Sequence, residues 1–131
     1  MARRTTGTLT EVELEFMQIL WLLNHAAPED LQNVLLERGR DLTGGSIRKM
    51  LLILMKKGYV KRVRDGKKYI YSPRVPQEQA NRSMLTELMN RAFGGSASIL
   101  VATLLSSSAV PEEDINLIEK LITECKKEAR K

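Results

Sequence analysis

Basic side chains are concentrated in residues 43–72, and they are the residues of this sequence best suited to binding chemistry. Nine lysines and arginines fall in this stretch against one acid, Asp65, so the stretch has a net charge of +8 where the whole chain has +5. Guanidinium and ammonium groups at this density neutralise phosphates, while the apolar residues between them can pack on their own domain. The pattern therefore predicts binding to duplex DNA.

The two halves of this basic stretch predict different contacts. Ser46, Arg48 and Lys49 fall at the start of a predicted helix, where side chains can reach base edges, and the Arg48 guanidinium matches the two acceptors of guanine. Thr43 precedes them as a cap or a phosphate contact, and the same two roles are the alternative for Ser46. Contacts with the backbone or the minor groove are expected from three residues at a predicted tight turn, which are Arg64, Lys67 and Lys68. A phosphate contact is the alternative role for Arg48, and a solvated face is the alternative for the whole stretch.

No group of residues has the composition of an enzyme active site. His25 is the sole histidine and Cys125 the sole cysteine, so neither a catalytic Cys–His pair nor a metal site is expected. Gly44 and Gly45 lack the lysine and the spacing of a phosphate-binding loop. The carboxylates gather at predicted helix starts, which explains them structurally. We therefore expect no enzyme, no metal and no cofactor.

The period of the apolar residues predicts two helices ahead of the basic stretch. Thr10 and Glu13 have the spacing of a capping box and open a helix that ends near residues 24–27. Trp21 falls in the apolar stripe of this helix, where a core role is expected. Pro28 suits the first turn of a second helix, which closes at residues 38–39.

A third helix and a hairpin complete the predicted arrangement. The helix begins around residues 43–46, and Gly58 suits its C-terminal end. The period then changes to that of a strand, Asp65-Gly66 is a tight-turn signal, and the returning strand ends at Pro73. Three helices followed by a hairpin is the order of a winged helix-turn-helix, with the third helix in the major groove and the hairpin along the flanking backbone.

The C-terminal part predicts a separate helical lobe. Helices are expected after Pro76 as far as Gly94, over residues 98–105, and from Pro111 onward. Residues 1–72 carry +5 and the remainder carries no net charge. These helices are too small to bury a core by themselves, so we expect them to form a homodimer interface. The expected interface residues are Ile99, Leu100, Leu104, Ile115, Ile118, Leu121 and Ile122.

These expectations define the fold class and the location of the protein. The class is mainly α, with a winged helix-turn-helix DNA-binding domain at 1–75 and a helical dimerisation domain at 76–131. The first eight residues do not resemble a secretory signal. The most apolar run, residues 16–23, is far shorter than the ~20 residues that span a bilayer. We therefore expect a cytoplasmic protein with no membrane insertion.

The sequence resembles the penicillinase repressor family, the BlaI, MecI and CopY type of bacterial transcriptional repressors. The resemblance covers about residues 9–121. The motifs that carry it are LTEVELEFM at 9–17, ILW at 19–21, SIR at 46–48, LMKKGYV at 54–60, KKYIYS at 67–72 and FGG at 93–95.

This resemblance implies a homodimeric repressor that binds a dyad-symmetric operator until a signal inactivates it. Base contacts in the family come from the start of the third helix, which corresponds here to Gly45, Ser46, Arg48 and Lys49. Family members that respond to β-lactams are cut at an Asn-Phe pair, and that position holds Ala102-Thr103 here. Copper-responsive members carry Cys-x-Cys motifs, which a chain with Cys125 alone lacks. A membrane-bound metalloprotease sensor that acts indirectly is a candidate partner.

Two other functions remain open on the sequence. A winged-helix lobe can serve as a protein-binding module whose basic face meets an acidic partner. Alternatively, a regulator of this kind can sense a small ligand between its C-terminal helices. Salt titration of DNA binding separates the first from a repressor, and calorimetry with candidate ligands addresses the second.

Overall fold

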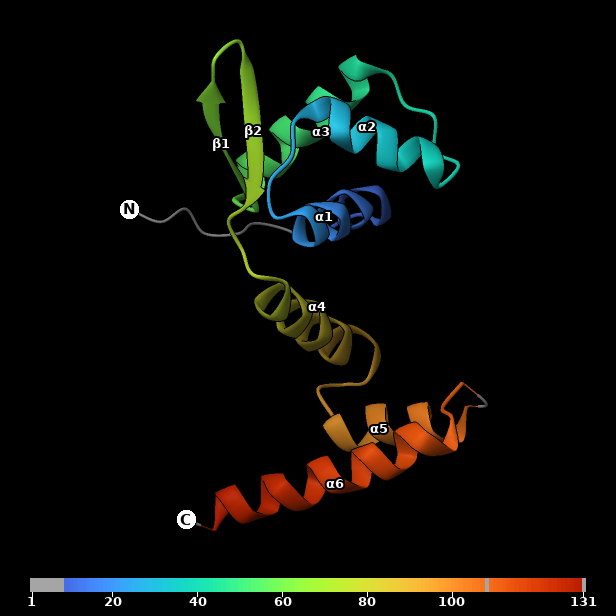
Figure 1. Ribbon diagram of the computed structural model, residues 1–131. Helices are drawn as coiled ribbons and strands as arrows, with labels where there is room; N and C mark the ends of the chain where they lie inside the picture. The colour runs from blue at the N-terminus through green and yellow to red at the C-terminus, as the bar shows by residue number, and fades with distance from the viewer. Residues whose placement is uncertain (1–8, 108, 131) are drawn as a thin grey trace. The chain divides into compact units, whose positions relative to one another are not determined.

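The computed structural model describes residues 9–107 and 109–130, so the first eight residues lie outside it. Figure 1 shows the order of its helices and strands, which is the order that the sequence predicts. The elements are α1 (Glu11–Leu23), α2 (Pro28–Glu37), α3 (Gly44–Lys57), β1 (Val60–Asp65), β2 (Lys68–Pro73), α4 (Gln77–Ala92), α5 (Ala97–Ser106) and α6 (Glu112–Ala129). The mainly α fold class with a small winged helix-turn-helix is confirmed.

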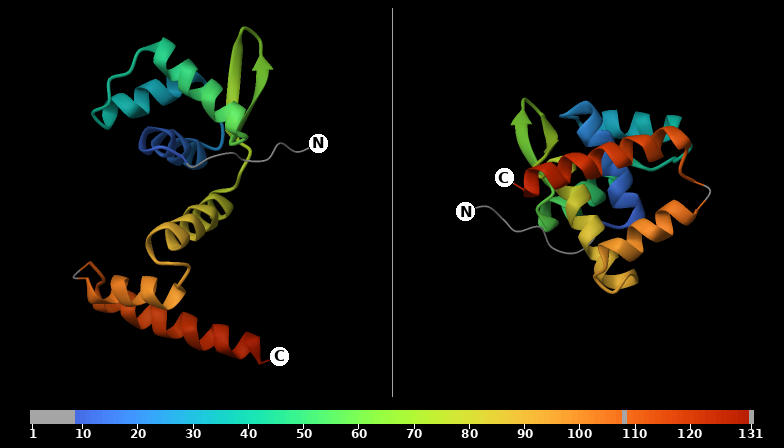
Figure 2. Two further views of the ribbon diagram at one scale, coloured as in Figure 1. Left: turned by 180° about the vertical axis from the view of Figure 1, so that it is seen from behind. Right: turned by 90° about the horizontal axis from the view of Figure 1, so that it is seen from below.

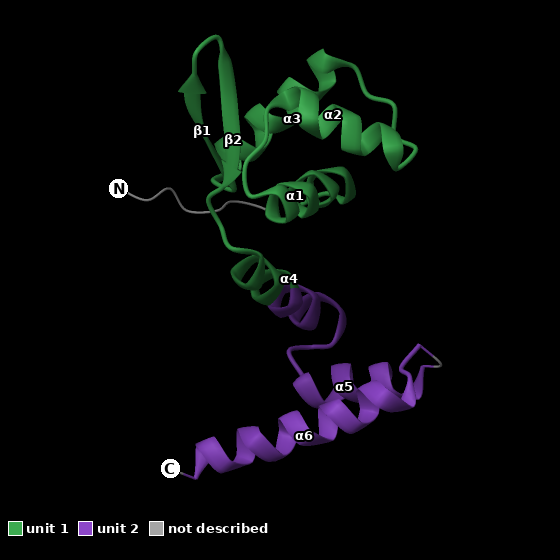
Figure 3. Cartoon of the chain, in the orientation of Figure 1, with its two compact units in different colours: residues 1–84 green, residues 85–131 purple. Residues whose placement is uncertain are grey.

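The chain divides into two compact units, Met1–Met84 and Leu85–Lys131 (Figure 3). The division falls inside α4. The first unit holds α1 to α3 and the hairpin, and the second holds α5 and α6.

The predicted capping box opens α1. The Thr10 N–H donates to Glu13 Oε1 at 2.8 Å, and the Glu13 N–H donates to Thr10 Oγ1 at 3.2 Å. Two N–H groups that lack helical partners are thereby satisfied. α2 begins at Pro28, and the Asp30 carboxylate accepts from the Ala27 N–H at 2.9 Å. These caps fix where both helices begin.

One apolar core joins the elements of the first unit. The Trp21 ring packs against this core, and its Nε1–H donates to the Val75 carbonyl oxygen at 2.9 Å. The predicted structural role of Trp21 is confirmed. The largest side chains in the core with no exposed area are Phe16, Met17, Ile19, Leu20, Leu31, Leu35, Ile47, Leu51 and Leu54. Because all three helices contribute to this set, the start of α3 is held on a rigid base.

The hairpin that follows α3 forms the wing of the fold. Gly58 ends α3 in the left-handed conformation at φ 86°, as the sequence predicts. The register pairs Asp65 with Lys68, so the two central residues of the turn are Gly66 and Lys67. The expected Asp-Gly turn is thus displaced by one residue. Gly66 has φ 65° and Lys67 has no positive φ, which is the pattern of a type II′ turn with glycine in first place.

A backbone bridge holds the wing against the helices. The Ala26 N–H donates to the Tyr71 carbonyl oxygen, and the Tyr71 N–H donates to the Ala26 carbonyl oxygen, both at 2.8 Å. The link between α1 and α2 therefore adds a short third segment beside β2. Figure 2 shows the hairpin extending beyond the three helices from behind and from below.

A buried ion pair joins the start of α1 to the end of α3. Lys57 Nζ lies 2.7 Å from Glu13 Oε1, and the two side chains are 24% and 5% exposed. Burial raises the pKa of Glu13, but hydrogen bonds from Lys57 and from the Thr10 N–H outweigh it and hold the pKa below its usual range. Lys57 is one of the nine basic residues of the 43–72 stretch that are expected to bind phosphates, but Glu13 binds it inside the unit.

The second unit contains apolar helices without a core of their own. Gly94 and Gly95 both have positive φ and separate α4 from α5, and the Ser96 hydroxyl caps α5 by accepting from the Ile99 N–H at 3.1 Å. No residue of 85–107 or 109–130 is buried.

The helices that the structure describes were compared with the length and apolar composition of a membrane span. None of them is by itself long and apolar enough to cross a bilayer. α4 and α5 meet the length and composition criteria only as a pair, and that pair is bent by 91° at its break.

Candidate nucleic-acid interface

The start of α3 presents the side chains expected to contact bases. The Thr43 hydroxyl accepts from the Ser46 N–H at 3.1 Å and lies 3.0 Å from the Ser46 hydroxyl. This arrangement caps the helix, as predicted for Thr43, and it orients the hydroxyl of Ser46 as well. Ser46, Arg48 and Lys49 are all exposed.

The guanidinium of Arg48 folds back over the first residue of α3. A Cβ atom on Gly44 would lie 3.3 Å from Arg48 Nη1, which is a close contact. Glycine at this position therefore leaves room for the guanidinium beside the helix start. The guanidinium therefore lies against the first turn of α3.

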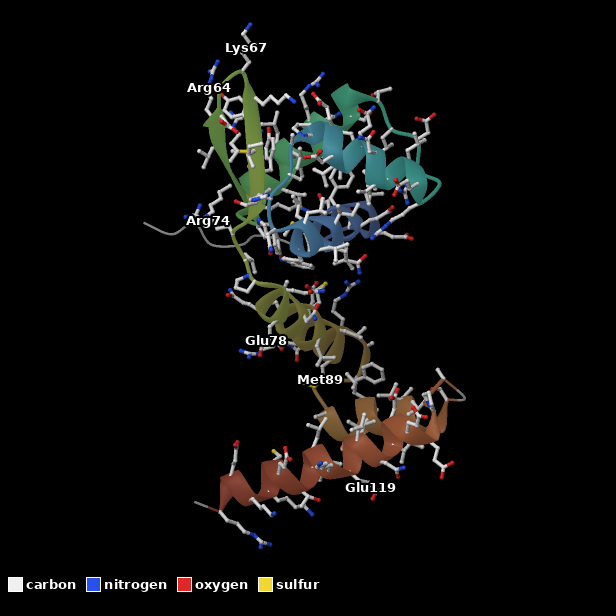
Figure 4. The ribbon with its side chains drawn as sticks, viewed as in Figure 1. Arg64, Lys67, Arg74, Glu78, Met89 and Glu119 are labelled. Carbon is white, nitrogen blue, oxygen red and sulfur yellow. The ribbon has the colours of Figure 1, made fainter. Side chains whose placement is uncertain are left out.

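The wing presents its basic side chains at and near its turn. In Figure 4 the side chains of Arg64 and Lys67 extend from the end of the hairpin away from the helices. Arg64 Nε donates to the Gly66 carbonyl oxygen at 3.2 Å. Lys68 Nζ lies 3.5 Å from Glu29 Oε2 at the start of α2, and because both side chains are largely exposed, this pair contributes little to stability.

An open groove brings three of the predicted DNA-binding residues together. Arg48 from α3 and Lys67 and Lys68 from the wing line it. The remaining lining residues come from α2, from α3 and from β2, and they are Pro28, Glu29, Gln32, Gly44, Tyr69 and Tyr71. The predicted residues Thr43, Ser46, Lys49 and Arg64 do not line the groove. An open groove between a helix start and a hairpin can place Arg48 at a base edge and the two lysines at the flanking phosphates.

The sequence reasoning missed Arg62. Its guanidinium carbon lies 4.0 Å from the centre of the Tyr69 ring, and its Nη1 donates to the Tyr71 hydroxyl at 3.3 Å. This hydrogen bond raises the pKa of Arg62, so the side chain stays charged. The sequence signal that could have identified Arg62 was the alternation of side chains along the hairpin. Arg62 and Arg64 are two apart on one strand, so they share a face.

The residues predicted for dimerisation lie on α5 and α6. Ile99 and Leu104 on α5 are exposed, as are three residues on α6, namely Ile115, Leu121 and Ile122. Leu100 and Ile118 are half-buried. Cys125 is exposed on α6, and no group of metal-binding side chains occurs among the residues that the structure describes.

Comparison with known proteins identifies the family. A family model described as penicillinase repressor matches residues 9–124. The chain is 25% identical over 120 residues to the penicillinase repressor of Bacillus licheniformis, with 90% of this chain and 91% of that protein covered. It is 21% identical over 117 residues to the methicillin resistance regulatory protein MecI of Staphylococcus aureus, with 89% and 94% covered.

The fold has a counterpart among solved structures. The solution structure of the DNA binding domain of the repressor BlaI is 23% identical to this chain, with a TM-score of 0.50. The match between the two structures covers 60% of this chain and 93% of that domain, which supports the winged-helix fold. Together with the family match over most of the length, this shows that the chain belongs to the penicillinase repressor family and is a winged-helix transcriptional repressor, not an enzyme.

Proposed function

We propose that two copies of this chain bind a dyad-symmetric DNA operator and block transcription of the genes behind it, in the bacterial cytoplasm, until a signal inactivates the repressor. The observation that carries this proposal is the groove in which Arg48 meets Lys67 and Lys68. A recognition helix and a wing that share one basic surface can bind the major groove and the flanking backbone together. The relative named as a penicillinase repressor and the relative named as a methicillin resistance regulatory protein support the same function.

The side chains divide into two roles in this proposal. Ser46, Arg48 and Lys49 contact bases, with the Arg48 guanidinium able to bind a guanine through two parallel hydrogen bonds. The side chains that bind phosphates are Thr43, Arg64, Lys67 and Lys68. Phosphate contacts position the protein on the duplex, and base contacts select the sequence.

We further propose that residues 1–75 bind DNA and residues 76–131 form the dimer. The second unit offers exposed apolar residues and no buried ones within 85–107 and 109–130, so a second copy is what would cover them. Two-fold symmetry then presents two copies of α3 to the two half-sites of a palindrome. The interface residues in this proposal are Ile99, Leu100, Leu104, Ile115, Ile118, Leu121 and Ile122.

A salt titration of DNA binding tests the proposed function. The probe is a labelled duplex with the sequence upstream of the gene that encodes this chain. Its binding to the full-length protein is measured by fluorescence anisotropy. If the dimer makes about six to eight phosphate contacts, log affinity falls against log salt with a slope of about −5 to −7. A protein that ignores this duplex and a mixed-sequence duplex even in dilute salt is not an operator-binding repressor.

A further inference from the structure

Four side chains gather on one face of the wing. The register pairs Arg62 with Tyr71 and Arg64 with Tyr69, and residues two apart on a strand point to the same face. The guanidinium carbons of Arg62 and Arg64 lie 4.0 Å and 5.7 Å from the centre of the Tyr69 ring. Two arginines thus share one aromatic ring, and Arg62 is the closer of the two.

This face of the wing is anchored at one end and open at the other. Tyr71 is 3% exposed, and its backbone is bonded to Ala26 in both directions. Tyr69 is 36% exposed, and both tyrosines line the groove that contains Arg48. Arg62 is therefore held beside the proposed DNA surface by one fixed ring and one partly exposed ring.

The contacts of Arg62 leave most of its hydrogen-bonding capacity free. A guanidinium has five N–H donors in one plane, and the Tyr71 hydroxyl accepts one of them. The contact of Arg62 with the Tyr69 ring is a cation–π contact, which is not a hydrogen bond. The remaining donors can form a planar fork, which is the geometry that binds phosphate through two hydrogen bonds.

We propose that Arg62 binds an operator phosphate and that Tyr69 is the residue that positions it. The proposal rests on the proposed function and adds a contact to it. Arg62 differs from Lys67, which extends from the turn on a long side chain with many rotamers to lose on binding. Because Tyr69 and Tyr71 already order Arg62, its side chain loses less conformational entropy when it contacts DNA.

A double-mutant cycle on the full-length protein tests this positioning. The probe is a fluorescently labelled mixed-sequence duplex of about 40 base pairs, which accommodates two half-sites. A phosphate contact is independent of sequence, so this duplex is sufficient. Arg62→Ala should weaken binding about tenfold and reduce the magnitude of the salt slope by about one for each protomer that loses the contact.

The second arm of the cycle separates positioning from direct contact. Tyr69→Leu removes the ring and should weaken binding about threefold to tenfold, whereas Tyr69→Phe keeps the ring and should bind nearly as the parent does. In the Arg62→Ala background, Tyr69→Leu should cause a much smaller loss than in the parent, because most of its effect passes through Arg62, the closer of the two arginines on the ring. Additive losses would overturn the positioning role.

Two further variants distinguish the loss of the Arg62 contact from misfolding and from the loss of one positive charge. Arg82→Ala removes the same charge from an exposed side chain on α4 and should bind as the parent does. Arg62→Lys keeps the charge but not the planar fork, so it should lose about fivefold in affinity with an unchanged melting temperature. Parent-like affinity in both Arg62 variants overturns this inference alone, whereas failure of the unsubstituted protein to bind DNA overturns the proposed function with it.

Discussion

Arg48 is the residue whose surroundings most favour a role in sequence selection. It lies at the start of α3 against Gly44, and it lines the groove together with the wing lysines. Lys67 also lines this groove, and its side chain extends from the turn of the hairpin (Figure 4). The same basic surface thus contains one residue suited to base edges and others suited to phosphates.

Substitution of these two residues should separate the roles. Arg48→Ala should weaken operator binding by about 1–3 kcal/mol and relax the preference at one base pair in each half-site. Lys67→Ala should weaken binding to all duplexes about equally, because phosphates carry no sequence information. Selection from a randomised duplex library measures both effects. An unchanged base preference in Arg48→Ala would assign this residue to the backbone instead.

At the scale of elements, the ion pair between Glu13 and Lys57 connects the first helix to the third. Glu13 has a pKa below its usual value of 4.5 in the folded protein. A carboxyl whose pKa is lowered by folding stabilises the fold above its unfolded pKa, and the contribution is lost as the pH falls through the folded pKa. The pair therefore stabilises the position of α3 at neutral pH.

Glu13→Gln should reveal this contribution. Glutamine can still accept at the capping box, but it carries no charge to pair with Lys57. We expect the variant to be less stable at pH 7 by about 1–3 kcal/mol, with the difference shrinking as the pH falls below about 4.5. Urea denaturation at several pH values measures it. A difference that does not change with pH would show that the charge of Glu13 is unimportant.

The wing depends on a glycine at its turn. Gly66 has φ 65°, and a Cβ atom at this position would meet no other atom within 4 Å, so alanine there introduces backbone strain and no clash. Gly66→Ala should cost about 1–2 kcal/mol and weaken DNA binding, because the proposed phosphate contacts lie on the hairpin. Gly39 offers a matched control, since it has φ 86° and equally open surroundings at the end of α2. Gly39→Ala should lower the melting temperature similarly and leave DNA affinity unchanged.

At the scale of the whole molecule, the exposed apolar residues of α5 and α6 require an explanation. Leu121 is 63% exposed in the single chain, and its helix has no buried residue among those that the structure describes. A homodimer through this unit would cover such residues and would also set the separation of the two copies of α3.

Charged substitutions test this assembly. Leu121→Glu and Ile118→Glu should dissociate the dimer and strongly weaken operator binding, because an unpaired carboxylate would be buried in the interface. Leu22→Glu is the matched control, since Leu22 is 69% exposed on α1 in the first unit. Sedimentation equilibrium should find this control dimeric. Intact dimers in the α6 variants would place the interface elsewhere.

The sequence alone determined the order of the elements and the place of the charge. Caps and breakers act within a few residues, so Thr10 with Glu13, Pro28 and Gly58 predict helix ends that the structure confirms. The local excess of lysine and arginine likewise predicts a DNA-binding surface without any coordinates.

Only the tertiary structure decided which basic residues remain available to DNA. Lys57 is bound by Glu13, which lies 44 positions earlier, whereas Lys68 forms only an exposed pair with Glu29, 39 positions earlier, and stays accessible. The position of Arg62 between two tyrosines depends on the strand register, which a shift of one residue in the turn would change. Sequence patterns report neighbours along the chain, whereas these pairings form when distant segments are brought together by the common core.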